Sequence, residues 1–187
     1  MKALSLFFAA LMCFTSVAQA HDDENRTIAD YEKALVQFDT WSKNINKPLF
    51  YKTTVMVDKN TKKQTKFDDL NDLQKDLFYL WQCEVLANQM LTLDFYWKQE
   101  LQTAPARTKV YSAEELKDQT RKPDKDDIKG FQERLSKLRQ THAVQFEKLL
   151  DDIFKKQADA IPENDRKLYK ARIVKWNDNQ KLIERGE

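Results

Sequence analysis

The chain has 187 residues, with 32 Lys or Arg against 30 Asp or Glu and a net charge of +2. This near-neutral balance excludes the strongly basic domain typical of nucleic-acid-binding proteins. The chain also has only two glycines. Phosphate-binding loops and nucleophile elbows need glycine for close backbone approach, so neither can be built in its usual form.

Residues 1–20 have the features of a secretory signal peptide: a basic start, a short apolar core, and the small residues Ala18 and Ala20 at the end. We expect cleavage after Ala20 and a periplasmic or secreted product. The apolar core is too short to cross a bilayer, and we expect no transmembrane segment in the mature chain. Residues 21–187 are long enough for one domain with a core of its own.

The first expected helix covers 27–46. Thr27 is a suitable N-cap, with Asp30 in the first turn, and Pro48 follows the helix. Apolar residues recur at three- and four-residue steps and form one stripe: Ile28, Tyr31, Leu35, Phe38, Trp41 and Ile45.

Residues 49–67 have a different composition, since β-branched and aromatic residues surround a turn-like segment. We expect a short extended or hairpin-like insertion. One interpretation is a partner-binding edge strand with a basic tip formed by Lys59, Lys62, Lys63 and Lys66. The interpretation that we favour is a surface loop with solvated lysines, which packs Leu49, Phe50, Val55 and Val57.

The central expected helix covers 68–103 and is apolar on nearly every side between Leu77 and Trp97. A helix of this kind must be surrounded by other elements. Polar residues such as Gln82 and Glu84 interrupt the run, so the segment is not a membrane span.

The second half of the chain predicts three more helices. A capping box at Ser112 predicts a short helix near 113–120, and long helices are expected over 125–159 and 163–185. The apolar positions of 125–159 follow a 3.6-residue period, which favours globular packing over a coiled coil. The sequence therefore predicts an all-α fold, an irregular bundle of four principal helices.

His142 falls on the apolar stripe of helix 125–159, between Leu138 and Phe146. We expect a buried histidine whose ring nitrogens are satisfied in the core. The alternative is a small hydrolytic enzyme that uses Glu84, Asp94 and His142. The common zinc, redox and di-iron motifs do not occur in the sequence, and we expect no cofactor.

His21 would become the first residue after cleavage. Its α-amine and imidazole together can bind Cu(II), so an extracytoplasmic copper-binding protein is a further hypothesis. A terminal histidine resembles the copper brace of oxidative polysaccharide enzymes and some copper carriers in this respect alone. A solvated tail is the favoured interpretation. Cys83 is expected to be a buried, inert thiol, with an intermolecular disulfide as the alternative.

These features favour a non-enzymatic exported helical protein that binds another envelope or secreted protein. Adaptor, chaperone-like and toxin-neutralising roles all fit. The segments expected to present a binding surface are 49–67 and the connection 103–124, which contains the short helix.

Overall fold

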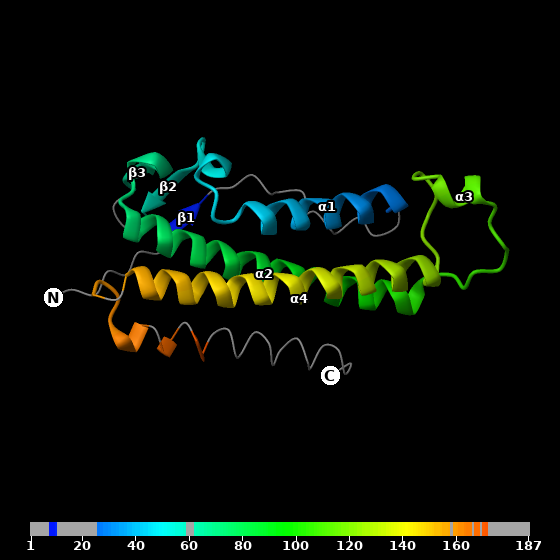
Figure 1. The fold of residues 1–187 in the computed structure, drawn as a ribbon. Coiled ribbons are helices and arrows are strands. Elements are labelled where there is room, and N and C mark those ends of the chain that lie inside the picture. The colour runs from blue at the N-terminus through cyan, green and yellow to red at the C-terminus, as the bar shows by residue number, and fades with distance from the viewer. Residues whose placement is uncertain are drawn as a thin grey trace.

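The computed structural model describes most of the chain, namely residues 8–10, 26–58, 62–157, 159–165, 167–168 and 170–171. Three long helices lie lengthwise beside one another: α1 (Ile28–Asn44), α2 (Asp72–Thr103) and α4 (Lys125–Lys156) (Figure 1). Successive long helices run antiparallel. The predicted all-α bundle is confirmed for this part of the chain. None of the described helices is both long enough and apolar enough to cross a bilayer.

Helix α1 forms as its sequence predicts. The Asp30 carboxylate accepts a hydrogen bond from the Thr27 backbone N–H over 2.9 Å, which completes a capping box. The helix ends at Asn44, two residues before the predicted end, within the usual fraying of a helix terminus. Every residue of the predicted stripe is buried against α2 and α4: Ile28, Tyr31, Leu35, Phe38, Trp41 and Ile45.

The insertion after α1 is a small antiparallel sheet, as expected. Strand β2 (Val55–Asp58) pairs with β3 (Gln64–Lys66), with Met56 opposite Thr65. On its other side β2 pairs with β1 (Phe8–Ala10). Since β1 belongs to the expected signal peptide, cleavage after Ala20 would reduce the sheet to the β2–β3 hairpin.

The expected packing of this insertion was right for Phe50, which packs against both cores, and wrong for Leu49 and Val55. Leu49 is 83% exposed and Val55 is 36% exposed, whereas Tyr51, Met56 and Phe67 are buried. Successive side chains of a strand point to opposite faces, so the inward position of Met56 turns Val55 outward and leaves Val57 only half-buried. The described lysines of the basic tip, at 62, 63 and 66, are exposed as expected.

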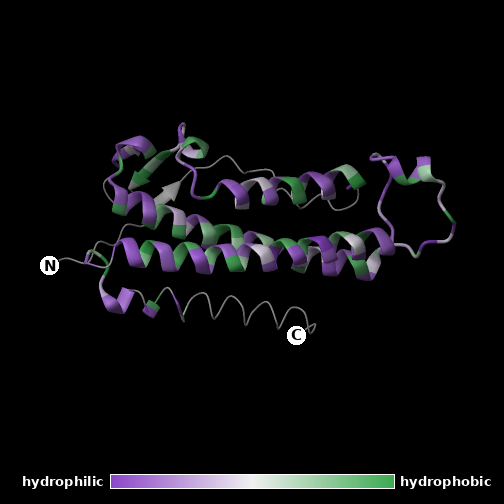
Figure 2. Cartoon of the chain, in the orientation of Figure 1, coloured by the Kyte–Doolittle hydropathy of each residue, from purple (hydrophilic) through white to green (hydrophobic). Residues whose placement is uncertain are grey.

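Helix α2 is apolar on more than one face because it serves two cores, and Figure 2 shows hydrophobic positions at intervals along it. One face packs against α1 and α4 through Leu80, Cys83, Leu86, Met90, Leu93 and Trp97. Another face packs Phe78 and Tyr79 against the insertion residues Tyr51, Met56 and Phe67. The helix begins at Asp72 rather than 68, because Asn71 caps it and a 3-10 turn occupies 67–69.

Helix α4 begins at the predicted residue, where Asp124 accepts hydrogen bonds from the backbone N–H groups of Asp126 and Asp127. It ends at Lys156, three residues before the predicted end, with Gln157 as its C-cap. The side-chain amide of Gln157 donates a hydrogen bond to the Asp76 carboxylate over 2.7 Å. Of the predicted helix 163–185, the described residues up to 171 are helical, and 172–185 lie outside the described residues.

Candidate docking site at one end of the bundle

A loop over residues 104–124 stands at the end of the bundle where α1 begins, α2 ends and α4 begins (Figure 1). Its base is closed by a hydrogen bond from the Lys125 N–H to the Pro105 carbonyl, 3.0 Å long. On the α1 side, the backbone N–H groups of Ile28 and Ala29 donate to the carbonyls of Arg121 and Gln119. These bonds satisfy N-terminal amides of α1 and anchor the loop to two helices.

Ion pairs hold the first and the last residues of the loop together. Arg107 Nε donates to Asp124 Oδ2 over 2.7 Å, and its Nη2 donates to Asp127 Oδ1 over 3.0 Å. Arg121 reaches the same Asp127 oxygen over 2.7 Å. Burial raises the pKa of Asp124, but the hydrogen bonds from Arg107 and from backbone amides outweigh it, so the pKa is lowered.

Tyr111 lies among three cations of this loop. The centre of its ring is 4.7 Å from Arg121 Cζ, 4.8 Å from Lys109 Nζ and 5.4 Å from Arg107 Cζ. Cation–π contacts of this kind add to the ion pairs. The loop therefore has a defined shape that depends on polar contacts rather than on a core.

The short helix α3 (Ala113–Lys117) stands within this loop and buries none of its residues. Ser112 caps it, and Lys109 donates to Glu115 over 2.8 Å. That hydrogen bond, with the Ser112 backbone N–H, lowers the pKa of Glu115 to about 2. The prediction of 113–120 was too long, because the Asp118 side chain accepts from the Thr120 N–H in a turn that stops the helix.

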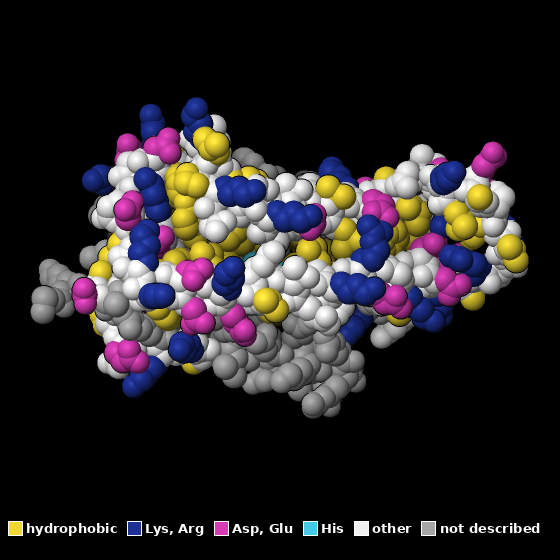
Figure 3. Space-filling view, viewed as in Figure 1, with side chains coloured by type: hydrophobic (Ala, Val, Ile, Leu, Met, Phe, Trp, Pro, Cys, Tyr) yellow, Lys and Arg dark blue, Asp and Glu magenta, His cyan; other side chains and the backbone are white. Residues whose placement is uncertain are grey.

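Two apolar side chains of the 104–124 loop are exposed to solvent. Val110 is 96% exposed and Leu116 is 45% exposed. Figure 3 shows hydrophobic side chains at this end of the molecule, with charged side chains around them. An apolar centre inside a charged rim is the usual composition of a protein–protein contact surface.

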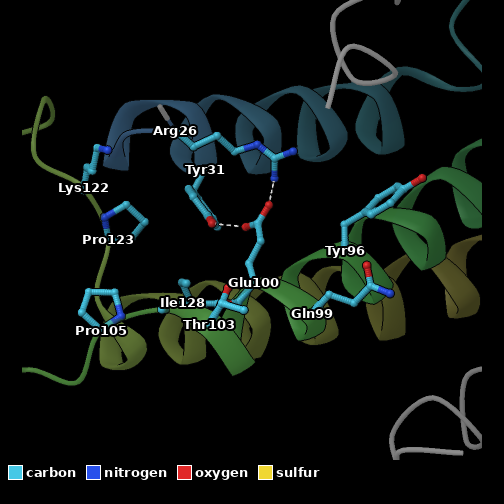
Figure 4. A pocket seen from close by; sticks show the side chains of 11 residues that line it. Arg26, Tyr31, Tyr96, Gln99, Glu100, Thr103, Pro105, Lys122, Pro123 and Ile128 are labelled. Atoms are coloured by element: carbon cyan, nitrogen blue, oxygen red, sulfur yellow. Dashed lines mark hydrogen bonds and ion pairs between the residues drawn. The ribbon is translucent and has the colours of Figure 1, made fainter. Parts of the chain in front are cut away.

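A cavity of about 370 Å³ lies beside the base of the loop (Figure 4). The Glu100 carboxylate of α2 accepts hydrogen bonds from the Tyr31 hydroxyl and from Arg26. Burial raises the pKa of Tyr31, and the hydrogen bond to the Glu100 carboxylate raises it further. This hydroxyl therefore stays protonated and donates. The remaining wall is contributed mostly by α2 and the loop: Tyr96, Gln99, Thr103, Ala104, Pro105, Lys122, Pro123 and Ile128.

The residues of the hydrolase hypothesis are not assembled into one site. Glu84 and Asp94 are ten residues apart on α2, which separates them by about 15 Å along the helix axis. Asp94 accepts from the buried Arg139 Nη1 over 2.7 Å, so its charge is balanced by a guanidinium. His142 instead contacts Ser42 and the Cys83 carbonyl. This arrangement gives the three-residue hypothesis no support.

His142 is a buried histidine with both ring nitrogens in hydrogen bonds, as expected from its place on the stripe. Cys83 is a free, buried thiol, also as expected, and burial raises its pKa. His21 lies outside the described residues, so the copper hypothesis stays a prediction. Within the described part of the chain, no three His, Cys, Asp or Glu side chains converge as metal ligands.

Comparisons of the chain with protein-family models, with curated proteins and with solved structures gave no match. The capping box of α3 is visible in the sequence, and the connection 103–124 is recognisable as a candidate surface. The Arg107–Asp124 pair and the contact of Tyr31 with Glu100 join distant positions, and no sequence spacing marks them.

Proposed function

We propose that the chain is an exported protein that binds another envelope or secreted protein, and that the 104–124 loop is its docking surface. One observation carries this proposal: α3 buries none of its residues, while ion pairs and a capping box hold the loop in one shape. A segment ordered in this way without a core of its own is suited to contact a partner.

The length and composition of the loop support this role. Helix–helix connections in bundles usually have about 2–8 residues, so the segment 104–124, with α3 inside it, is long for a connection between α2 and α4. This one is tied to α1 and α4 by backbone hydrogen bonds. Burial of Val110 and Leu116 by a partner would gain about 25 cal/mol for each Å² of apolar surface removed from water.

The expected partner has two features. It presents an apolar cleft to receive Val110 and Leu116, which are exposed. It also carries carboxylates or hydroxyls at the rim to meet the basic side chains of the loop. The binding role requires no catalysis by the chain, and adaptor, chaperone-like and toxin-neutralising proteins all use contacts of this type.

Affinity capture from the native envelope extract, read by mass spectrometry, tests the proposal. The chain beginning at His21 is compared with a loop variant carrying Val110→Asp and Leu116→Asp. The matched control carries Val36→Asp and Val144→Asp, two valines that are 60% and 68% exposed on α1 and α4. All three proteins are first checked for the same helical content and thermal midpoint.

The proposal predicts one partner at fixed stoichiometry with the wild type and with the control variant, and its loss with the loop variant. Equal capture by the loop variant would contradict the assignment of the surface. An empty capture by all three would count against the binding role itself.

A further inference from the structure

A serine and a histidine from different helices lie within hydrogen-bond reach where α1, α2 and α4 meet. Ser42 Oγ of α1 is 3.2 Å from Nδ1 of His142 on α4. Nε2 of His142 is 3.0 Å from the Cys83 backbone carbonyl oxygen on α2. Ser42 is 9% exposed and His142 is 1% exposed, so the packing of three helices fixes their geometry.

The hydrogen-bond partners determine which ring nitrogen of His142 is protonated. A carbonyl can only accept, so the single ring proton of the neutral imidazole lies on Nε2, toward Cys83. Nδ1 then directs a lone pair at the Ser42 hydroxyl. Burial lowers the pKa of His142, against a smaller opposing effect of the Cys83 carbonyl, and favours this neutral form.

This is the arrangement of a nucleophile beside a general base that a third group orients. In the common triads a carboxylate orients the histidine. Here the Cys83 carbonyl takes that place. The sequence does not indicate this pair, because Ser42 lies in the last turn of α1 and is 100 residues away from His142.

Gln145 competes for the serine proton. Its side-chain oxygen accepts from Ser42 Oγ over 2.8 Å. The hydroxyl has one hydrogen, so it donates either to Gln145 or to His142. Rotation about the serine Cβ–Oγ bond moves the hydrogen from one acceptor to the other, and Gln145 therefore restrains the nucleophile.

Ser42, Gln145 and His142 line a cavity of about 310 Å³. This volume is within the range of small-molecule sites. Asn46 and Lys148 also line it and carry N–H groups of the kind that stabilise negative charge on an acyl oxygen. The cavity thus holds a nucleophile, a base and donors together.

We propose that Ser42 and His142 form a nucleophile–base pair that accepts an acyl group from a small carboxylic ester in this cavity. Ser42 Oγ bonds to the carbonyl carbon as its proton passes to His142 Nδ1. The bond from that carbon to the alcohol oxygen then breaks, and His142 returns the proton to the leaving oxygen. The products are an acyl-serine and an alcohol. This site is separate from the 104–124 loop, and the proposal does not depend on the binding role.

A fluorophosphonate probe tests the pair, because the serine oxygen displaces fluoride from phosphorus by the same proton transfer. The chain beginning at His21 is incubated with the probe, and the adduct is read by intact mass and by peptide sequencing. We expect one adduct per chain, on Ser42, formed at a rate that rises with pH as His142 becomes neutral.

Three variants accompany the wild type, each checked for folding by circular dichroism. His142→Asn is expected to slow labelling at least tenfold, and Gln145→Met to accelerate it several-fold because the competing acceptor is lost. Ser136→Ala, at a half-buried serine of α4 that does not line this cavity, is the control and should label as the wild type does. No adduct on the wild type, an adduct on another residue, or equal rates with Gln145→Met and His142→Asn would overturn the proposal. The wild-type and Gln145→Met results decide the matter even if His142→Asn fails to fold.

Discussion

The Arg107 guanidinium and the Asp124 carboxylate join the two ends of the 104–124 loop, with Nε 2.7 Å from Oδ2. Asp124 is also the N-cap of α4. One carboxylate therefore fixes the start of a principal helix and the shape of the candidate docking surface. The two roles can be separated by mutation, since Arg107 takes part only in the second.

Asp124→Ala is expected to lower the free energy of unfolding by about 1 kcal/mol through loss of the helix cap. Arg107→Ala should change the thermal midpoint little and should make the loop more susceptible to a glutamate-specific protease at Glu114 and Glu115. Thermal unfolding and limited proteolysis measure the two effects. Arg134→Ala, which breaks an ion pair with Glu32 away from the loop, is the control. Equal cleavage of Arg107→Ala and Arg134→Ala would count against the role of Arg107.

The Asp94–Arg139 pair is expected to be among the most sensitive sites for stability. Arg139 is 1% exposed, and Asp94→Ala leaves its charge buried without this carboxylate. We expect a loss of about 3–5 kcal/mol in urea unfolding. Lys98→Ala, at a cation whose side chain is 34% exposed and lies 3.9 Å from the same carboxylate, should cost less than about 1 kcal/mol. The double variant Asp94→Leu with Arg139→Met removes both charges and should recover much of this loss of stability. A free energy of unfolding for the double variant that is reduced by the sum of the losses of Asp94→Leu and Arg139→Met would contradict this explanation.

Protonation of His142 should oppose folding. Its pKa in the folded chain lies below the ordinary value of 6.5, because burial disfavours the charged ring. Below pH 6.5 the unfolded chain therefore binds more protons, so stability falls as the pH falls from 6.5 toward the lower folded pKa. Urea unfolding at pH 7, 6 and 5 should show a smaller decline for His142→Gln than for the wild type. Parallel declines in the two proteins would show that another group is responsible.

The helices were predictable because a buried helical face leaves a periodic pattern. The stripe of α1 and the burial of His142 and Cys83 follow from spacing alone. Some helix ends lie a few residues from the predicted positions because side chains there accept hydrogen bonds from backbone N–H groups, as Asn71 and Asp118 do. The candidate surface was recognisable only as a connection that contains a short capped helix.

The remaining features depend on contacts between distant positions. Asp124 is recognisable as an acid at a helix start, but its bond to Arg107 spans 17 residues with no regular structure between them. Ser42 meets His142 across 100 residues. The facing of β2 was mispredicted because an alternating strand of apolar residues fits a core with either face. Only the position of α2 decides that Met56 is the inward residue.

The register of the insertion gives a further prediction. Met56→Ala should cost about 2–5 kcal/mol, since it empties space among Tyr51, Phe67 and Phe78. Val55→Ala, on the outward face, should change stability by less than about 0.5 kcal/mol. Urea unfolding of the two variants compares the faces directly. A greater loss for Val55→Ala would reverse the assignment of the strand.

Site-specific photocrosslinking in the native cell tests whether the 104–124 loop is the surface that binds a partner. A photoreactive residue is placed at Val110 in the loop, and at Val144 on α4 as a control that is also exposed. If the loop is the docking surface, position 110 gives one crosslinked partner of constant mass, in lower yield when Leu116→Asp is added, and position 144 gives no product of that mass. The same partner crosslinked from position 144 and absent from position 110 would place the docking surface on the helices and contradict the account.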